Sequence, residues 1–200
     1  MSGILILGTG LAGYTLAREF RKLDANAPLT LVTRDAGSFY SKPVLSNAFA
    51  QGKGPQQIAL NSADDMARQL KATVHPHVTV TALHAAQRRV TTDNGLTLEG
   101  DSVALALGAD PIRLPLAGDA ADGVLSVNDL DDYARFREAL QGKQRVVMLG
   151  AGLIGCEFAN DLRAAGLDVA VIDPAPQPLG RLLPPRAAAF LRAALEAAGV

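Results

Sequence analysis

The sequence has little cysteine, an almost balanced charge and no long apolar run. One cysteine, Cys156, occurs among 200 residues, which excludes an internal disulfide and any Cys-x-x-Cys pair. The formal net charge of -1 gives the whole chain no bias toward nucleic acid or a membrane surface. No stretch reaches the roughly 18 consecutive apolar residues that a membrane-spanning helix needs. Because the start of the chain is also too short for a signal peptide, we expect a cytoplasmic protein with no membrane span and no nucleic-acid partner.

Histidine is scarce as well, and the three histidines indicate no metal site. His75 and His77 have a spacing that could bracket a metal ion, but neither His84 nor any other residue is indicated as a third ligand. We therefore expect surface or hairpin histidines and no bound metal.

The sequence does contain enough apolar residues for a core, and two glycine-rich segments. Hydrophobic residues make up 48% and charged residues 20% of the chain, as in a globular protein. Residues 8–13 and 150–155 both read Gly-x-Gly-x-x-Gly, begin 142 residues apart and each follow a short apolar run. One such segment is a weak signal, whereas two, each placed between a strand and a helix, indicate a chain that holds two dinucleotides.

Each glycine segment lies inside a predicted βαβ unit. Residues 4–7 and 29–32 are apolar runs typical of strands, and residues 11–23 carry apolar side chains at helical spacing. The same order recurs over residues 146–149, 153–165 and 169–172. We predict an α/β fold of two Rossmann-like, three-layer units with right-handed crossovers.

Further elements are predicted around these units. Residues 36–58, rich in Gly, Ser, Pro and Gln, are expected to form a long functional loop, and residues 110–118 a linker. Residues 103–107 are typical of a buried strand that Gly108 ends. Short strands are expected at 78–80, 89–91 and 96–98, a hairpin turn at 93–95, and helices at 64–71, 129–140 (capped by Asn128 or Asp129) and 185–198.

The linker divides the chain into two predicted domains, residues 1–111 and residues 112–200. A doubly wound domain needs a further strand after the last predicted helix, and Val200, which would begin that strand, is the final residue. We therefore expect both domains to be incomplete and the chain to be part of a longer protein.

The glycine segments predict how phosphates are bound. The first glycine permits the tight turn, the second lets the backbone approach a pyrophosphate, and the third allows close packing of helix on strand. The phosphates would lie against free N–H groups at the positive end of the helix dipole. The alternative is a glycine-rich turn that only packs. The predicted cofactor-binding residues are Gly8, Gly10, Leu11, Ala12 and Gly13 in the first segment and Gly150, Gly152, Leu153, Ile154 and Gly155 in the second.

An acidic residue after the second strand of each unit is expected to bind a ribose hydroxyl. Asp35 lies 22 residues after Gly13, and Asp173 lies 18 residues after Gly155, both near the expected spacing of about 20. Asp173 follows its strand directly, whereas Asp35 lies beyond two intervening residues and could equally be a solvated loop residue. A carboxylate at Asp173 would repel a 2′-phosphate and so favours NADH, although Arg181 further along could argue for NADPH.

Several segments together resemble one protein family. The first glycine segment with residues 14–19, the Tyr-Ser-Lys-Pro-Val-Leu-Ser stretch at 40–46, residues 128–137 and residues 150–162 resemble the flavoprotein pyridine nucleotide oxidoreductases, in particular the bacterial rubredoxin–NAD reductases. The resemblance covers essentially the whole chain. It implies that the first unit binds FAD and that the second binds NADH as an insertion within the FAD domain.

The resemblance also implies two catalytic side chains. Lys42, followed by Pro43, takes the place of an Arg-Pro pair beside the flavin in many relatives, where a cation could stabilise negative charge on the reduced ring; a solvent-exposed loop lysine is the alternative. Many ferredoxin-reductase relatives have a second lysine where this sequence has Asn47. Glu157 takes the place of a glutamate near the nicotinamide–flavin junction that can pair with the flavin-side cation. The dipole of a first helical turn alone would also stabilise a carboxylate, by about 0.3–1 kcal/mol.

Two further expectations come from the resemblance. Residues 105–111 resemble the family's crossover strand, with Leu107 in place of threonine, which implies that Ala106 and Gly108 contact the cofactor. Relatives that reduce disulfides or peroxides have cysteine after the first βαβ unit, whereas residues 36–50 contain none. We expect Cys156 to be a buried structural residue rather than a redox one.

The implied function is that of an FAD-dependent NADH reductase that passes electrons through flavin to a rubredoxin-type one-electron carrier. The alternatives are a ferredoxin reductase or NADH oxidase of the same fold and a non-catalytic nucleotide-binding module. Because the family's later FAD-contacting segment and C-terminal interface domain are not in the sequence, we expect these 200 residues alone to have weak activity or none.

Overall fold

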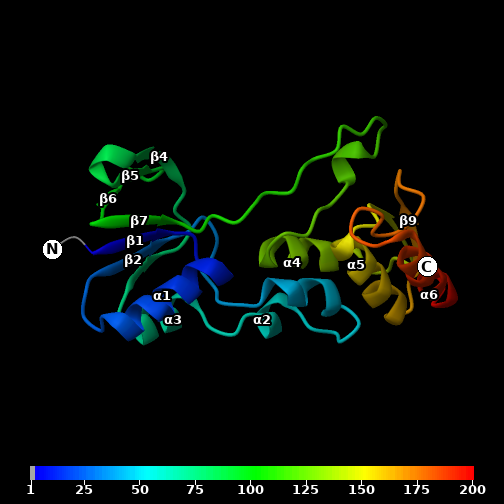
Figure 1. The fold of residues 1–200 in the computed structure, drawn as a ribbon, viewed down its shortest axis with the longest axis horizontal. Helices are drawn as coiled ribbons and strands as arrows, with labels where there is room; N and C mark the ends of the chain where they lie inside the picture. Colours follow the sequence, from blue (N-terminus) through cyan, green and yellow to red (C-terminus); the bar gives the residue numbers. More distant parts are fainter. Residues whose placement is uncertain (1–2) are drawn as a thin grey trace. The chain divides into compact units, whose positions relative to one another are not determined.

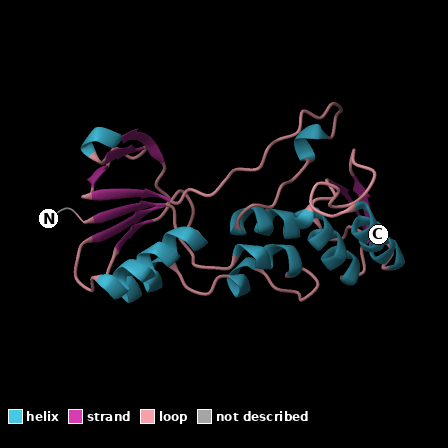
Figure 2. Cartoon of the chain, viewed as in Figure 1, coloured by secondary structure: helices cyan, strands magenta, loops and turns pink. Residues whose placement is uncertain are grey.

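The computed structural model describes residues 3–200, whose helices and strands group into two compact units (Figures 1 and 2). The first unit contains the chain up to Lys42 together with residues 59–113, and the second contains residues 43–58 and 114–200. The expected domain of residues 1–111 thus includes a segment, 43–58, that the contacts group with the second unit. None of the helices in the described part of the chain has the length and apolar character that crossing a bilayer requires.

The first unit is built on a four-stranded parallel sheet. Its strands lie in the order β3, β2, β1, β7, so β1 is central and has a parallel partner on each side. The strands are β1 (Ile4–Leu7), β2 (Leu29–Val32), β3 (Thr73–His75) and β7 (Ser102–Leu105). This is the doubly wound arrangement that the first βαβ pattern predicts.

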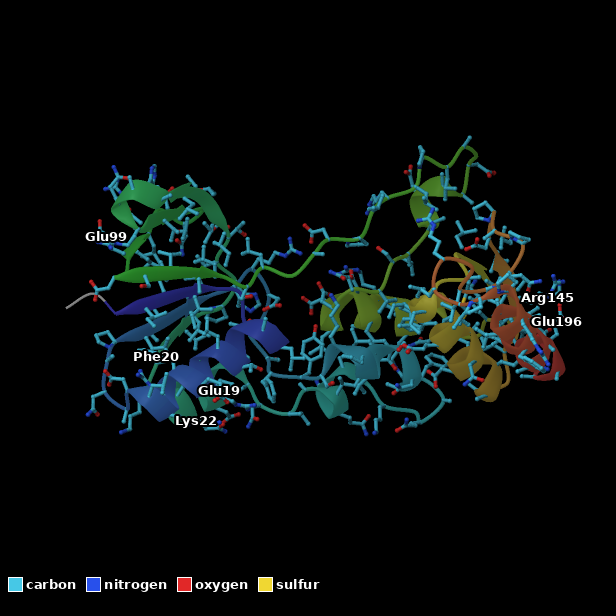
Figure 3. The ribbon with its side chains drawn as sticks, viewed as in Figure 1. Glu19, Phe20, Lys22, Glu99, Arg145 and Glu196 are labelled. Atoms are coloured by element: carbon cyan, nitrogen blue, oxygen red, sulfur yellow. The ribbon has the colours of Figure 1, made fainter. Side chains whose placement is uncertain are left out.

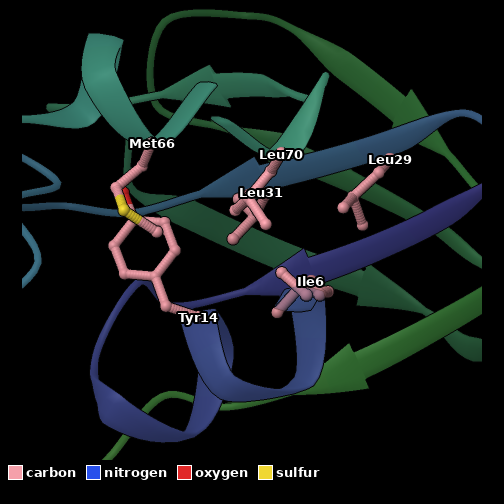
Figure 4. Packing of buried hydrophobic residues seen from close by; sticks show 7 residues of the cluster. Ile6, Tyr14, Leu29, Leu31, Met66 and Leu70 are labelled. Carbon is pink, nitrogen blue, oxygen red and sulfur yellow. The ribbon is translucent and has the colours of Figure 1, made fainter. Parts of the chain in front are cut away.

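Alternate side chains of the central strands pack on opposite faces of this sheet. Ile6 and Leu31 face the helices α1 (Leu11–Leu23) and α3 (Ala63–Leu70), where they pack with Tyr14 and Met66 (Figure 4). On the other face, Leu5, Leu7 and Val32 pack against Val78 and Val90 beside an antiparallel meander. The meander strands are β4 (Val80–His84), β5 (Arg89–Thr92) and β6 (Thr97–Glu99). The unit therefore has three layers, with the period-two alternation of strands buried on both faces.

The second unit contains a two-stranded parallel sheet and four α-helices. The strands are β8 (Arg145–Leu149) and β9 (Asp168–Ile172), and the helices are α2 (Pro55–Ile58), α4 (Leu130–Ala139), α5 (Leu153–Ala164) and α6 (Pro185–Ala197). Ala159 and Leu162 of α5 pack on Val169 of β9, and Phe49 joins this cluster. A residue from the 43–58 segment is thus part of the core of this unit.

The helix ends follow local sequence signals. The side chain of Ser62 accepts a hydrogen bond from Asp65 N while the carboxylate of Asp65 accepts one from Ser62 N, a capping box that begins α3. Asp129 caps α4 through its side chain, as one of the two expected residues. The solvent-facing sides carry ion pairs, such as Lys22 with Glu19 on α1 (Figure 3).

Three sequence expectations about strands and loops need correction. The strand expected at 78–80 begins only at Val80 and continues to His84, and β3 has no counterpart among the expected strands. Residues 103–107 are not a buried strand, because β7 ends at Leu105 and the side chains of Leu105 and Leu107 are 61% and 65% exposed. β7 lies at the edge of the sheet, beside β1. Residues 36–58 contain the 3-10 helix η1 (Lys42–Asn47) and α2 within the expected loop.

A test of the first unit's packing is the substitution Tyr14→Phe. The buried Tyr14 hydroxyl donates a 2.6 Å hydrogen bond to the carbonyl oxygen of Gly37, and burial raises the pKa of the phenol. Loss of the Tyr14 hydroxyl leaves the buried carbonyl oxygen of Gly37 without its donor. We therefore expect the free energy of unfolding to fall by about 1–3 kcal/mol. Thr15→Val, which removes an exposed hydroxyl from the same helix, should change it by less than about 0.5 kcal/mol. Urea unfolding of both variants measures the difference, and equal stabilities would contradict it.

Candidate functional site: two glycine turns

The first glycine turn joins β1 to α1 through contacts that exclude a side chain. Gly8 has a φ of +109°, and a Cβ atom there would lie 2.2 Å from the carbonyl oxygen of Ala106. A Cβ atom on Gly13 would lie 2.0 Å from the carbonyl oxygen of Gly8. Both distances are far below van der Waals contact, so only glycine permits the helix to approach the strand this closely.

The amino end of α1 is open where the second glycine of the turn lies. Gly10 is the N-cap residue, without a side-chain cap, and a Cβ atom there would meet no atom within 4 Å. The first intrahelical bond runs from Tyr14 N to Gly10 O, so the N–H groups before Tyr14 have no intrahelical acceptor. Ala12 and Leu11 begin the helix beside them, with no acidic side chain in the first turn. An anionic phosphate would find both free donors and the positive end of the helix dipole here.

The second glycine turn, between β8 and α5, repeats the contact between its third and first glycines and the open helix end, although a Cβ atom on Gly150 would meet no atom within 4 Å. Gly150 has a φ of +107°, and a Cβ atom on Gly155 would lie 2.0 Å from Gly150 O. Gly152 is the N-cap residue, again without a side-chain cap, and a Cβ atom there would likewise meet no atom within 4 Å. Leu153 and Ile154 follow it and are 52% and 53% exposed. The two turns therefore share the close approach and the open helix end.

The two predicted ribose-binding aspartates both lie beside their glycine turns. Asp173 binds the second turn directly, because its carboxylate accepts hydrogen bonds from Ala151 N and Ala175 N, each 2.7 Å long. These bonds lower the pKa of Asp173, and Arg181 adds a smaller effect in the same direction. Asp35 accepts hydrogen bonds from Thr33 Oγ1 and Gly37 N at 2.8 Å and a longer one, 3.4 Å, from Thr9 Oγ1 in the first turn.

A pocket of about 330 Å³ lies next to Asp173 in the second unit. Its lining includes Cys156, Gln177, Arg192 and Glu196, and Gln177 Oε1 is buried without a hydrogen-bond partner. Burial raises the pKa of the Cys156 thiol, and the carboxylates of Asp173 and Glu157 raise it further. A thiol in such surroundings is a poor nucleophile, in line with the expected structural role of this cysteine.

Lys42 belongs to a small charged group in the first unit. Arg34 forms an ion pair with Asp110, and this pairing, with a smaller contribution from Lys42, lowers the pKa of the exposed Asp110. Gly108, two residues before Asp110, has a φ of +71°. No motif indicates that Arg34 pairs with Asp110, because they are 76 residues apart in the sequence and only the fold brings them together. Pro43 follows Lys42 in the sequence and begins the part of the chain that belongs to the second unit.

Glu157 has a partner that the sequence does not indicate. Its Oε2 atom accepts a 2.5 Å hydrogen bond from the hydroxyl of Ser46, a residue 111 positions earlier. The expectation that Glu157 lies in the first helical turn is wrong, since α5 begins at Leu153 and its first turn has no acidic residue. The helix dipole acts mainly within the first turn, so the bond to Ser46 accounts better for the position of the carboxylate.

The described residues, 3–200, contain no cluster of three or more His, Cys, Asp or Glu side chains that could hold a metal ion. The features that remain are two glycine turns, each at the carboxyl end of a parallel strand and each with an aspartate at its side. They define an α/β protein of the Rossmann type. The chain belongs to the pyridine nucleotide-disulphide oxidoreductase family, whose family model matches residues 2–200.

Named relatives are similar over the whole chain. It is 47% identical to a rubredoxin-NAD(+) reductase of Acinetobacter baylyi over an alignment of 205 residues. The alignment covers 100% of this chain and 52% of the relative. It is 44% identical to a rubredoxin-NAD(+) reductase of Alcanivorax borkumensis, with the same coverage of each. Among solved structures, the covalent putidaredoxin reductase–putidaredoxin complex matches with a TM-score of 0.88 and 28% identity, covering 100% of this chain and 48% of that one. The chain spans about half the length of these relatives.

Substitutions in the first turn should separate packing from phosphate binding. Gly13→Ala places a methyl group against the Gly8 carbonyl oxygen, and we expect it to lower the free energy of unfolding by at least about 1–3 kcal/mol. Gly10→Ala meets no atom within 4 Å and should change stability by less than about 1 kcal/mol while weakening binding of a dinucleotide.

Thermal unfolding and flavin content, measured on the two variants of the full-length protein, test this prediction. A Gly10→Ala protein that retains wild-type flavin content would contradict the role of Gly10 in binding. A Gly13→Ala protein as stable as the wild type would contradict the packing argument.

Proposed function

We propose that the full-length protein is an FAD-dependent NADH reductase that passes electrons to a rubredoxin-type carrier. The observation that carries the proposal is the pair of open glycine turns in one chain, which suits one resident and one exchanging dinucleotide. The names of the two bacterial relatives support the choice of NAD and rubredoxin.

The first unit fits the diphosphate of FAD. A Cβ atom at Gly10 would project into open space at the amino end of α1, so a phosphate could approach the backbone N–H groups of Leu11, Ala12 and Gly13. Asp35 lies beside the same turn, with its Oδ1 atom held by Thr33 and Gly37. A carboxylate oxygen can accept more than one hydrogen bond, which leaves Asp35 able to bind a ribose hydroxyl as well.

The second unit fits NADH at the turn that begins at Gly150. Asp173 is held there by Ala151 N and remains ionised, because the hydrogen bonds from Ala151 and Ala175 lower its pKa. An ionised carboxylate accepts hydrogen bonds from the 2′- and 3′-hydroxyls of a ribose and repels a 2′-phosphate. We therefore propose NADH as the preferred donor.

Several further residues complete the proposed machinery. The chemistry that FAD would supply when bound is acceptance of a hydride from NADH and release of the two electrons one at a time. Lys42 would supply positive charge toward the reduced ring, and Pro43 would shape the chain beside it.

Two residues after β7 would line the cofactor. They are Ala106, whose carbonyl oxygen touches the Gly8 turn, and Gly108, which has a left-handed backbone. Glu157, held by Ser46, would orient the nicotinamide side of the junction.

The lone cysteine supports a separate electron carrier as the acceptor. Residues 36–50 contain no cysteine, and Cys156 is buried with a raised thiol pKa, so neither suits exchange with a disulfide. A cytoplasmic location is part of the same proposal, since a single cysteine and use of NADH suit a reducing compartment.

The proposal is tested by mixing the full-length, FAD-loaded protein with NADH under anaerobic conditions. We expect rapid bleaching of the flavin absorbance and, in steady state, reduction of rubredoxin well above the rates with ferredoxin and oxygen. Failure of NADH to bleach the flavin would leave only a nucleotide-binding module. Turnover with rubredoxin no faster than with oxygen would point to an oxidase.

The preference for NADH is tested by Asp173→Asn, which removes the charge with little change in shape. Without the negative charge that repels a 2′-phosphate, we expect the ratio of kcat/KM for NADH to that for NADPH to fall on the order of tenfold. Such a change corresponds to a difference of about 1.4 kcal/mol in binding free energy. Asp168→Asn, an exposed residue at the other end of β9, is the matched control and should leave the ratio unchanged. An unchanged ratio in Asp173→Asn would contradict the proposed role of this carboxylate.

A further inference from the structure

Residues 43–53 are attached to α4 and α5 by hydrogen bonds from their backbone. The carboxylate of Asp161 on α5 accepts hydrogen bonds from Phe49 N at 2.8 Å and Ala50 N at 3.2 Å. The carbonyl oxygen of Lys53 accepts hydrogen bonds from Tyr133 Oη at 3.0 Å and from the guanidinium of Arg137 at 2.9 Å, both on α4. The segment is therefore held at two points, by an acceptor group of α5 at one and by donor groups of α4 at the other.

Asp161 is an unusual residue for an interior helix position. Its side chain is only 6% exposed, and burial raises its pKa even though both backbone bonds favour the ionised form. A buried carboxylate is costly unless its hydrogen bonds are made, and the two N–H groups of the 49–50 turn satisfy it. Because the two N–H groups bind different oxygens of Asp161, an asparagine there would keep an acceptor for only one of them and present an NH2 donor to the other.

Aromatic packing fixes the same turn from the other side. Phe49 packs edge-on against Phe136 of α4, with ring centroids 6.0 Å apart, and Phe136 packs against Phe158 of α5 at 5.5 Å. Arg137 lies over the ring of Phe49, 5.2 Å from its centre. Ring packing alone leaves a peptide free to rotate, whereas the bonds to Asp161 define the orientation of the Phe49 and Ala50 peptides.

Ser46 lies three residues before Phe49 and contacts a second carboxylate of α5. Glu157 and Asp161 are four residues apart on this helix and so lie on one face. The side chain of Ser46 is 2% exposed, and its oxygen lies 2.5 Å from Glu157 Oε2 and 3.0 Å from Pro43 O. A hydroxyl has one hydrogen, so it can donate to only one of these acceptors at a time.

We propose that Asp161 is a positioning residue for the reaction: by holding the Phe49–Ala50 turn on α5, it keeps the Ser46 hydroxyl on Glu157 and so fixes the orientation of that carboxylate. The inference rests on the proposed function, in which Glu157 orients the nicotinamide side of the junction. Asp161 acts through the 46–50 segment, whose Phe49 and Ala50 N–H groups it binds. Ser46 is the group through which its effect reaches Glu157.

The test is a double-mutant cycle on the full-length, FAD-loaded protein. In Ser46→Ala and in Asp161→Asn, we expect the rate constant for anaerobic flavin reduction at saturating NADH to fall on the order of tenfold, because a small misplacement of an orienting group has effects of this size. Ser46→Ala/Asp161→Asn should be no slower than the slower single variant, since both substitutions break one pathway. Asp131→Asn, an exposed residue of α4, is the matched control and should match the wild type.

Amide hydrogen exchange supplies a second measurement that does not depend on activity. We expect the amides of residues 48–51 to exchange faster in Asp161→Asn and at the wild-type rate in Ser46→Ala and Asp131→Asn. This pattern separates loss of the turn from loss of the Glu157 contact. It also identifies a general loss of structure, which would raise exchange throughout the second unit.

Three results would overturn the inference. They are flavin reduction in Ser46→Ala as fast as in the wild type, a double variant slowed by the product of the two single effects, and unchanged exchange at residues 48–51 in Asp161→Asn. Flavin reduction in Ser46→Ala as fast as in the wild type overturns the inference even where Asp161→Asn does not fold. If the wild-type flavin is not reduced by NADH at all, the proposed function itself fails and the positioning role falls with it. If NADH reduces the flavin of the wild type and of the variants at the same rate, only the inference is overturned and the proposed function stands.

Discussion

The close contact between the third glycine of each turn and the carbonyl oxygen of the first is the constraint on which the structure depends. At Gly13 and at Gly155, a single methyl group would lie 2.0 Å from that oxygen. Because the helix can approach the strand end only without a side chain, the amino end of each helix is set beside its sheet. The open N–H groups, the position of Asp173 and the direction of α5 all follow from this approach.

The sequence was a good guide wherever a local pattern determines structure. The predicted α1, β1 and β2 have the observed bounds, because apolar runs between glycines and helical spacing are local signals. β3 could not be predicted in this way. Its three residues are Thr73, Val74 and His75, and they form a strand only because β2 supplies parallel partners. The exposure of Leu107, which lies beyond the end of β7, could not be predicted either, because an apolar run indicates burial but does not show where the strand ends.

In the candidate site, too, local spacing predicted some residues, whereas only the fold brings the others together. The glycine turns and Asp173 were predicted by spacing, because the chemistry of a helix amino end is determined within some 25 residues of chain. Ser46, Asp161 and Arg34 carry no such signal. The partner of Ser46 lies 111 residues away and that of Arg34 lies 76 residues away, so only the fold can pair them. Residues 150–162 of the resemblance include Asp161, but the resemblance does not indicate the two N–H groups that its carboxylate binds.

The grouping of residues 43–58 with the second unit has a consequence for synthesis of the protein on the ribosome. The chain passes between the units at residues 42–43, 58–59 and 113–114, so no single cut separates them. Residues 43–58 are made before Phe136 of α4 and Ala159 and Leu162 of α5, with which Phe49 packs. At roughly 5–20 residues per second, the hundred or so residues up to α5 take on the order of 5–20 s. During that interval the first unit can form its sheet while Phe49 of this segment still lacks its packing partners.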